Sequence, residues 1–235
     1  MEKKMKKCYI VGAGEFYGNP IPCEEDLVIA ADGGLDCLLK LGITPDVIVG
    51  DFDSLQNELE AMRLDEAEEP TRVQNKASDP HKTVINGKSV RVYRHPVMKN
   101  ETDMYLAYKI GASLGYSEFE LYGGVGGRED HTFANYCLLL DAKNDNNNLI
   151  LVGNGTKSFV IKNEKKRVFG VSGATVSVFA FGGGASGVSI KGLKYEAENV
   201  TLSPEFPLGV SNSFTESGEG EISVKSGALL VMVYC

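Results

Sequence analysis

The chain has 235 residues, of which 43% are hydrophobic and 24% charged, the balance of a globular protein with a substantial core. No apolar run approaches the roughly 18 residues that a membrane span needs, so we expect a soluble protein without a membrane partner. The net charge of −8 and the dispersed Lys and Arg argue against a nucleic-acid partner and favour a small ligand.

The N-terminus and the cysteines both favour a cytoplasmic protein. The lysine-rich start is followed by an apolar stretch, residues 8–11, that is far too short for a signal peptide. The cysteines are odd in number and form no C-x-x-C pair, which predicts reduced thiols rather than disulfides or a zinc site. They are Cys8, Cys23, Cys37, Cys137 and Cys235.

The first part of the chain alternates short apolar runs with helical patterns. Most of the runs are apolar on both faces, as central parallel strands must be. This alternation predicts an N-terminal Rossmann-like, mostly parallel α/β sheet with helices, and a ligand site at the strand ends. The predicted strands are 8–11, 27–31, 47–49, 119–122 and 149–152, and the helical patterns are centred on 35–39, 104–111 and 133–140. Residues 65–88 are polar and predict a loop or a short β-ribbon.

After about Gly155 the pattern changes to short alternating strands separated by glycine-rich turns. No helical period appears there, so we expect a small all-β sandwich. The predicted strands are 159–161, 175–179, 199–202, 221–224 and 229–233. The sequence therefore predicts an α/β domain over residues 1–154 and a β-sandwich domain over residues 155–235.

Clustered aspartates predict a magnesium site. Asp51 and Asp53 follow a predicted strand, and residues two apart in an extended segment project to the same side. Carboxylate oxygens converging at a strand end suit Mg²⁺, although a turn with an Asx cap is the alternative for an isolated D-x-D. Asp103 begins a helical pattern, and Thr102 directly precedes it. The simpler roles are a partner of the helix dipole for Asp103 and an N-cap for Thr102.

The stretch from Gly123 to His131 is the most informative one. It joins a strand to a helix expected to begin near Thr132, where free backbone N–H groups and the helix dipole favour a phosphate. Glycines let the backbone approach a ligand, and Arg128 adds a fork of donors. The segment lacks the ending of a Walker A loop, and a flexible glycine loop is the alternative. His131 is interpreted as a capping or packing residue.

Glycine or aspartate also follows other predicted strands. Four of the five strands in the first part end in such turns. Turns of this kind are expected to line a nucleotide-binding cleft. The candidate nucleotide-binding residues are Gly12, Gly14, Asp32, Gly33, Thr102, Gly124, Gly126, Gly127 and Arg128.

Several segments together resemble the thiamine pyrophosphokinase family. They occur in both halves and in the family's order. The matching segments are 31–34, 42–46, 49–54, 101–103, 123–135, 192–195 and 209–212.

This resemblance implies an ATP-binding α/β domain, a β-sandwich, and a homodimer in which thiamine lies between domains of different subunits. By resemblance Asp51, Asp53 and Asp103 hold Mg²⁺, while Arg128 and Asp130 belong to the nucleotide and phosphate site. The implied thiamine-binding residues are Ser189, Tyr195, Ser211 and Asn212.

The implied reaction is transfer of pyrophosphate from Mg-ATP to the hydroxyl of thiamine, releasing AMP. Such chemistry asks mainly for positioning and charge neutralisation, and either Asp103 or Asp130 is a candidate to accept the proton. Two alternatives remain at this stage. One is a kinase or pyrophosphokinase acting on another small alcohol, and the other is a nucleotide-binding sensor without catalysis.

Overall fold

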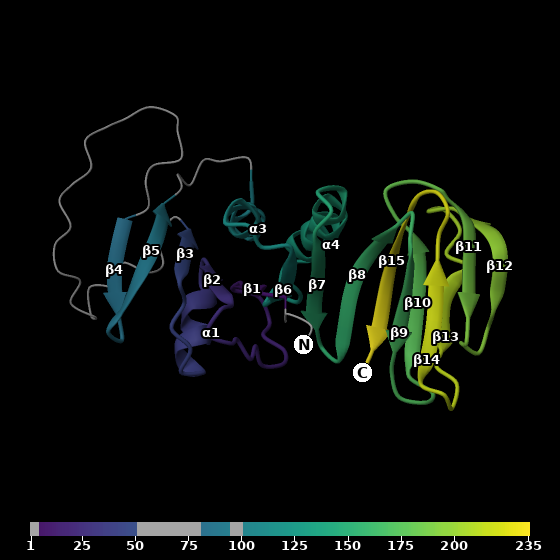
Figure 1. The fold of residues 1–235 in the computed structure, drawn as a ribbon, viewed down its shortest axis with the longest axis horizontal. Helices are drawn as coiled ribbons and strands as arrows, with labels where there is room; N and C mark the ends of the chain where they lie inside the picture. The colour runs from purple at the N-terminus through teal and green to yellow at the C-terminus, as the bar shows by residue number, and fades with distance from the viewer. Residues whose placement is uncertain (1–4, 51–80, 95–100) are drawn as a thin grey trace. The chain divides into compact units, whose positions relative to one another are not determined.

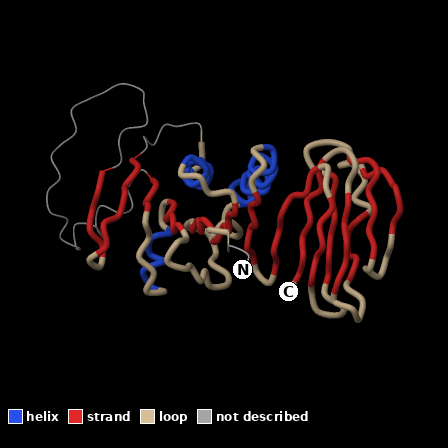
Figure 2. Tube along the Cα trace, in the orientation of Figure 1, coloured by secondary structure: helices blue, strands red, loops and turns tan. Residues whose placement is uncertain are grey.

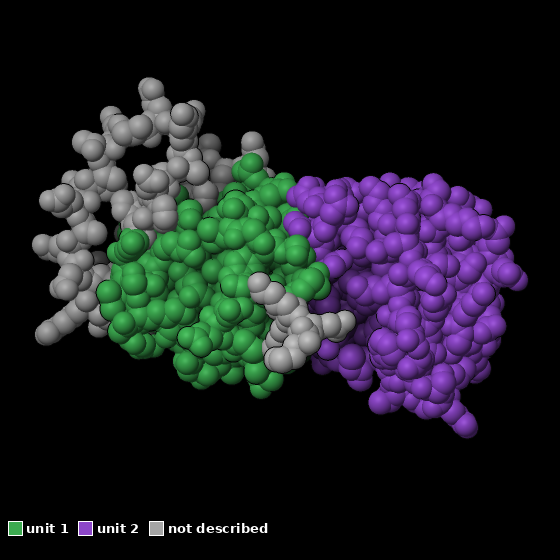
Figure 3. All heavy atoms as spheres, in the orientation of Figure 1, with its two compact units in different colours: residues 1–127 green, residues 128–235 purple. Residues whose placement is uncertain are grey.

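A computed structural model describes residues 5–50, 81–94 and 101–235 of the chain. These residues fall into two compact units, an N-terminal unit of residues 1–127 and a C-terminal unit of residues 128–235 (Figure 3). Each unit has its own arrangement of strands and helices.

The N-terminal unit is built on a mixed sheet with strand order β6-β1-β2-β3-β5-β4 (Figures 1 and 2). All neighbours pair in parallel except β4 and β5, which are antiparallel. The central strands β2 and β3 are buried along their whole length, as their apolar residues on both faces predict. The strands are β1 (Lys7–Val11), β2 (Leu27–Ala31), β3 (Val47–Gly50), β4 (His81–Ile85), β5 (Lys88–Arg94) and β6 (Glu118–Tyr122).

Two helices of this unit pack on the sheet: α1 (Gly34–Lys40) on β1 and β2, and α3 (Asp103–Ser113) on β1, β2 and β3. Gly111 allows α3 to approach closely, because a Cβ there would lie 2.8 Å from the Phe119 ring and 2.9 Å from Cys8 Sγ. At the other end of α3, the Met104 thioether lies against the Gly12 backbone just after β1. The helix therefore begins at the edge of the sheet where the parallel strands end.

The predicted strands and helices of the first part are confirmed, with boundaries shifted by a few residues. The ribbon interpretation is also confirmed for residues 81–88, since β4 and β5 form a hairpin around Asn86 and Gly87, both left-handed. Residues 65–80 lie outside the described part. The sequence did not predict that β5 also pairs in parallel with β3.

The C-terminal unit contains helix α4 (Glu129–Asn144) and two groups of antiparallel strands. One group has the order β13-β10-β15-β8-β7, with α4 packed on β7 and β8, and the other has the order β12-β11-β14-β9. The strands are β7 (Asn148–Gly153), β8 (Thr156–Lys162), β9 (Lys165–Phe169), β10 (Thr175–Ala180), β11 (Ala185–Lys191), β12 (Ala197–Leu202), β13 (Gly209–Ser213), β14 (Glu219–Ser223) and β15 (Ala228–Tyr234).

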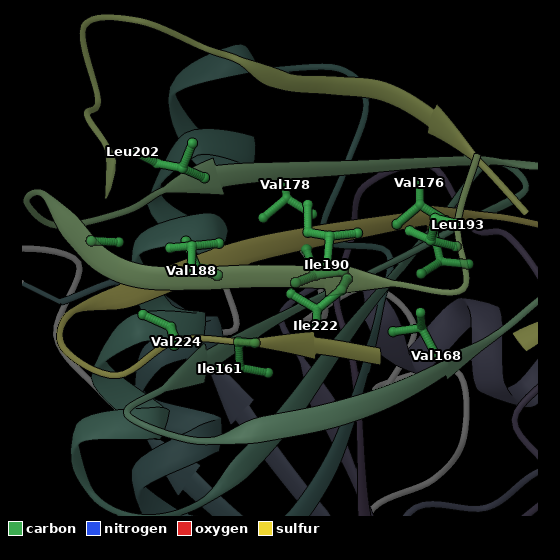
Figure 4. Close-up of a cluster of buried hydrophobic side chains, with 14 of the residues drawn as sticks. Ile161, Val168, Val176, Val178, Val188, Ile190, Leu193, Leu202, Ile222 and Val224 are labelled. Atoms are coloured by element: carbon green, nitrogen blue, oxygen red, sulfur yellow. The ribbon is translucent and has the colours of Figure 1, made fainter. Parts of the chain in front are cut away.

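Both groups of strands contribute to one hydrophobic core (Figure 4). Val176 and Val178 of β10 and Ile161 of β8 are fully buried with Val188 of β11 and Ile222 of β14. Each strand supplies alternate residues, so its other residues face away from this core. Two layers of strands sharing one core explain the alternating pattern that the sequence shows after Gly155.

Some details of this unit differ from the prediction. Helix α4 begins at Glu129 rather than near Thr132, because the backbone N–H of Thr132 already donates to Arg128 O at 3.1 Å and closes the first turn. Strands β9, β11 and β13 were not predicted. Strand β7 pairs antiparallel with β8 through a turn at residues 154–155, where the predicted domain boundary falls, whereas the compact units divide at 127–128. Among the described residues, no helix has the length and hydropathy to cross a bilayer.

We expect Gly111→Ala to destabilise the protein, although alanine is the better helix former by about 1 kcal/mol. The added Cβ meets the buried Phe119 and Cys8, and overpacking of this kind costs about 1–3 kcal/mol. Urea denaturation measures the difference, with Ser113→Ala on the exposed side of α3 as the control that leaves stability nearly unchanged. A Gly111→Ala variant as stable as the wild type would contradict this account of how α3 is seated.

Candidate active site

Backbone hydrogen bonds join the loops that follow β1 and β6. Gly12 N–H donates to Tyr122 O at 2.9 Å, and Gly14 N–H donates to Gly123 O at 2.9 Å. One residue further, Glu15 N–H donates to Val125 O at 3.0 Å. The two loops, far apart in sequence, therefore form one backbone platform at the carboxyl edge of the sheet.

This platform has no space for side chains at its central positions. A Cβ at Gly14 would lie 2.6 Å from Gly123 O, and one at Gly123 would lie 2.3 Å from Gly12 O. Gly123 also has a φ of +62°, a conformation that glycine adopts without strain. The sequence thus places glycines where two backbones touch, which is a structural role additional to the predicted approach of a ligand.

The end of the glycine loop is more open. Gly126 and Gly127 are exposed and left-handed, and a Cβ at Gly127 would meet no atom within 4 Å. At Gly126 a Cβ would contact the Glu15 side chain, with Glu15 Cδ at 2.5 Å. Glu15 in turn accepts a hydrogen bond from the Tyr17 hydroxyl. The open end of the loop is where backbone N–H groups can face a polyphosphate.

The turn after β2 packs against the same platform. Asp32 has a φ of 50°, and its N–H donates to Val49 O at 2.8 Å, which ties the ends of β2 and β3 together. A Cβ at Gly34 would lie 1.9 Å from Val11 O, so α1 begins in direct contact with the end of β1. The predicted residues Gly12, Gly14, Asp32 and Gly33 are therefore brought together by the parallel strand ends.

Thr102 and Asp103 lie at the start of α3. The Thr102 hydroxyl accepts a hydrogen bond from Tyr105 N–H at 3.2 Å, so its interpretation as an N-cap is confirmed. Asp103 is the first helical residue and is half-buried, one position before the methionine that contacts Gly12. The first turn of α3 therefore lies at the same edge of the sheet as the glycine platform.

Asp51 and Asp53 lie outside the described residues, so the predicted trio with Asp103 stays a prediction. Strand β3 ends at Gly50, and Asp51 is the next residue in the chain. Within residues 5–50, 81–94 and 101–235, no group of three His, Cys, Asp or Glu side chains forms a metal site by itself.

Arg128 and Asp130 form an exposed ion pair at the start of α4. Arg128 donates from Nε to Asp130 Oδ1 at 3.1 Å and from Nη2 to Oδ2 at 2.6 Å. These hydrogen bonds lower the pKa of the Asp130 carboxyl and raise that of the Arg128 guanidinium. Asp130 Oδ1 also accepts His131 N–H at 3.0 Å. Asp130 therefore orients the Arg128 fork, whose remaining N–H groups can bind phosphate.

The C-terminal unit contains a cleft of about 690 Å³. Tyr195 and Asn212, both predicted as substrate-binding residues, line it together with Glu196 and Glu198. Tyr195 is 61% exposed, and its ring lies 5.3 Å from its neighbour's ammonium, Lys194 Nζ. Aliphatic side chains complete the lining: Val188, Ile190, Val200, Leu202, Leu208 and Val210. An aromatic ring, two carboxylates and apolar walls suit a ligand that is both cationic and hydrophobic.

The two predicted serines have other contacts. Ser189 Oγ accepts the backbone N–H of Asn199 at 3.0 Å, which links β11 to β12. Ser211 is exposed and adopts a left-handed φ of 60° directly before Asn212. Neither serine is among the residues that line the cleft. The sequence reasoning missed Glu196 and Glu198, although their spacing of two was the same signal used for Asp51 and Asp53.

Comparison with known proteins identifies the two parts of the chain. The model of the thiamin pyrophosphokinase catalytic domain matches residues 23–151, and that of the thiamin pyrophosphokinase vitamin B1 binding domain matches residues 158–229. A thiamine pyrophosphokinase of Bacillus subtilis (strain 168) is 26% identical over 217 residues, covering 89% of this chain and 87% of the relative.

Solved structures with this fold come from bacteria and fungi. The crystal structure of thiamine pyrophosphokinase from Bacillus subtilis superposes with a TM-score of 0.77 at 22% identity, covering 97% of this chain and 99% of that one. Thiamin pyrophosphokinase from Candida albicans has a TM-score of 0.68 at 12% identity, covering 99% and 90%. Since the two family models match most of the chain in the expected order, the chain belongs to the thiamin pyrophosphokinase family.

Proposed function

We propose that the chain transfers the pyrophosphoryl group of Mg-ATP to the hydroxyl of thiamine, giving thiamine diphosphate and AMP. Pyrophosphokinase activity on thiamine follows from the family assignment, since both the catalytic and the vitamin B1 binding models match. The proposed placement of ATP and Mg²⁺ rests on one observation, the glycine platform at the carboxyl edge of the parallel strands, with Asp103 at the same edge.

The polyphosphate of ATP is assigned to the open end of the glycine loop and the start of α4. The exposed residues Gly126 and Gly127 offer backbone N–H groups that, with the helix dipole, are suited to anionic oxygens. The buried Gly124 is assigned to the inner part of the same loop. Arg128, oriented by Asp130, adds a guanidinium donor. The glycines Gly12, Gly14 and Gly33 with Asp32 form the adjoining backbone at the same strand ends.

Mg²⁺ is assigned to Asp51, Asp53 and Asp103. Oxygen ligands are those Mg²⁺ prefers, and a few carboxylates with substrate phosphates complete its usual coordination. When bound, the ion neutralises charge on the transferred phosphates. Removing it with EDTA is expected to abolish turnover, and added Mg²⁺ to restore it.

Thiamine is assigned to the cleft lined by Tyr195, Glu196, Glu198 and Asn212. The thiazolium of thiamine is a permanent cation with an apolar body, so a tyrosine face and two carboxylates match its chemistry. Ser189 and Ser211 are assigned to the surroundings of this cleft.

We also propose a homodimer with active sites shared between subunits. Exposed apolar residues near the cleft support it: Phe206, Leu208 and Val210.

The finer description of the fold and location is part of the proposal. The run of parallel strands with helices supports a Rossmann-like α/β domain over residues 1–154, and the shared core of two strand layers supports a β-sandwich over residues 155–235. All five cysteines are free thiols, which supports a cytoplasmic location.

Catalysis then rests on positioning and charge neutralisation. The thiamine hydroxyl attacks the β-phosphorus of ATP in line, and AMP leaves. The hydrogen bonds from Arg128 lower the pKa of Asp130 and make it a poorer proton acceptor. We therefore assign Asp130 to orienting Arg128, and leave the proton of the hydroxyl to Asp103 or to solvent.

Purified protein with ATP, Mg²⁺ and thiamine is expected to produce AMP and thiamine diphosphate in equal amounts. The comparisons do not favour the two alternatives, a different small alcohol or a nucleotide sensor. Both are tested in the same assay. Formation of ADP, faster turnover of pyridoxine or pterin alcohols, or ligand binding without nucleotide turnover would each reject the proposal.

We expect Asp103→Asn to lower kcat by about 100-fold, because it removes a charge that stabilises the transferring phosphates through the metal. The folded state is expected to persist, since asparagine keeps the shape of the side chain. Asp36→Asn is the matched control, an aspartate in the first turn of α1. Steady-state kinetics and thermal unfolding are measured for both, and equal kcat values for the two variants would contradict the assignment.

We expect Gly126→Ala to raise the KM for ATP about tenfold without changing the KM for thiamine. The new Cβ meets Glu15 and holds a left-handed φ of +78°, at a cost of about 1–2 kcal/mol that displaces the end of the loop. Gly184→Ala is the control, because its Cβ would meet only Leu202 O at 3.8 Å. An unchanged KM for ATP in Gly126→Ala would place the polyphosphate elsewhere.

A further inference from the structure

Strand β13 carries a β-bulge where it reaches the cleft. Val176 of β10 pairs with Asn212, but Val178 pairs with Gly209. An advance of two residues along β10 is therefore matched by three residues along β13. Val210 and Ser211 supply the extra residue opposite Ser177. Bulges of this kind redirect side chains and are enriched beside functional sites.

The bulge is held at both ends by features of β10. At one end, a Cβ at Gly209 would lie 2.3 Å from Val178 O, so only glycine fits. At the other end, Ser211 has a left-handed φ of 60°, a strained conformation for a residue with a side chain. Its N–H donates to Ser177 Oγ at 3.1 Å, and Ser177 is only 5% exposed. The buried hydroxyl takes the place of the carbonyl that a regular ladder would offer.

Asn212, the residue after the bulge, hydrogen-bonds the backbone of Tyr195 through its side chain. Asn212 is 5% exposed, and its Oδ1 accepts Tyr195 N–H at 2.9 Å while its Nδ2 donates to Tyr195 O at 2.6 Å. Asn212 Oδ1 also accepts Ser213 N–H at 2.9 Å. The amide oxygen and nitrogen of Asn212 therefore both bond backbone groups, and the position of Tyr195 depends on where the bulge directs Asn212.

We propose that Ser177 is a positioning residue for the substrate cleft, acting through Ser211 and Asn212 on Tyr195. The hydroxyl of Ser177 holds the left-handed Ser211, the bulge directs the Asn212 amide, and the amide fixes the backbone that carries the Tyr195 ring. This inference rests on the proposed function, because the ligand of the cleft is taken to be thiamine. Ser177 itself does not line the cleft.

The test compares Ser177→Ala with Ser158→Ala. Ser158 is a second buried serine of the same unit, 2% exposed, and shares a hydrogen bond with Tyr136 under α4. Both substitutions remove one buried hydroxyl. Ser177→Ala is expected to raise the KM and the calorimetric Kd for thiamine about tenfold, with the KM for ATP unchanged. Ser158→Ala is expected to leave both KM values within about twofold of the wild type.

A double-mutant cycle with Ser211→Gly tests the path. Glycine adopts the left-handed conformation without needing the hydrogen bond, so Ser177→Ala is expected to raise the KM for thiamine much less in the Ser211→Gly background. Equal effects of Ser177→Ala in both backgrounds would overturn the role of Ser211. If Ser177→Ala changed the KM for thiamine no more than Ser158→Ala does, the inference would fail while the proposed function stood.

Amide hydrogen exchange separates this inference from the proposed function. If the wild type does not turn over thiamine, the function fails, and the exchange of residues 209–213 decides the role of Ser177 alone. Faster exchange at Ser211 and Tyr195 in Ser177→Ala, but not in Ser158→Ala, supports the hydrogen-bonded path. Unchanged exchange at both residues overturns it.

Discussion

The contact between the backbones that follow β1 and β6 is the constraint on which the N-terminal unit depends. Gly12, Gly14 and Gly123 approach so closely that a Cβ at each position would lie within about 3 Å of a backbone oxygen or a Met104 side-chain atom. Parallel pairing of β1 with β6 brings these residues to one edge, and α3 and α1 are seated against the same backbone. The candidate nucleotide site therefore adjoins closely packed backbone.

The C-terminal unit positions its cleft by a different means. There the backbone is held by side chains, since the Ser177 hydroxyl supports Ser211 and the Asn212 amide holds Tyr195. Glycine tolerates a left-handed conformation at no cost, whereas Ser211 needs a hydrogen-bonding partner to keep it. The two units thus show two solutions to one problem, which is how to hold an irregular segment at the end of a strand.

How much the sequence predicts depends on how local the cause is. The run Leu27–Ala31 is apolar on both faces and predicts β2 without error, and the glycines after Tyr122 correctly mark a loop between a strand and a helix. Strands β9, β11 and β13 were missed because polar and glycine residues interrupt their apolar pattern, as in Lys165–Phe169 and Gly209–Ser213. The bond between Asn212 and Tyr195 spans 17 residues, and its partner is chosen by tertiary packing that no local pattern encodes.

Electrostatics distinguishes the two candidate substrate regions. The loop from Gly123 to Arg128 offers backbone donors and a guanidinium, which suit a polyphosphate, whereas Glu196 and Glu198 beside Tyr195 suit a cation. The net charge of −8 is compatible with both, because selectivity depends on the groups within reach of each ligand. A polyphosphate would be repelled by the acidic cleft and a thiazolium by Arg128. The carboxylates of one region and the guanidinium of the other therefore suit ligands of opposite charge.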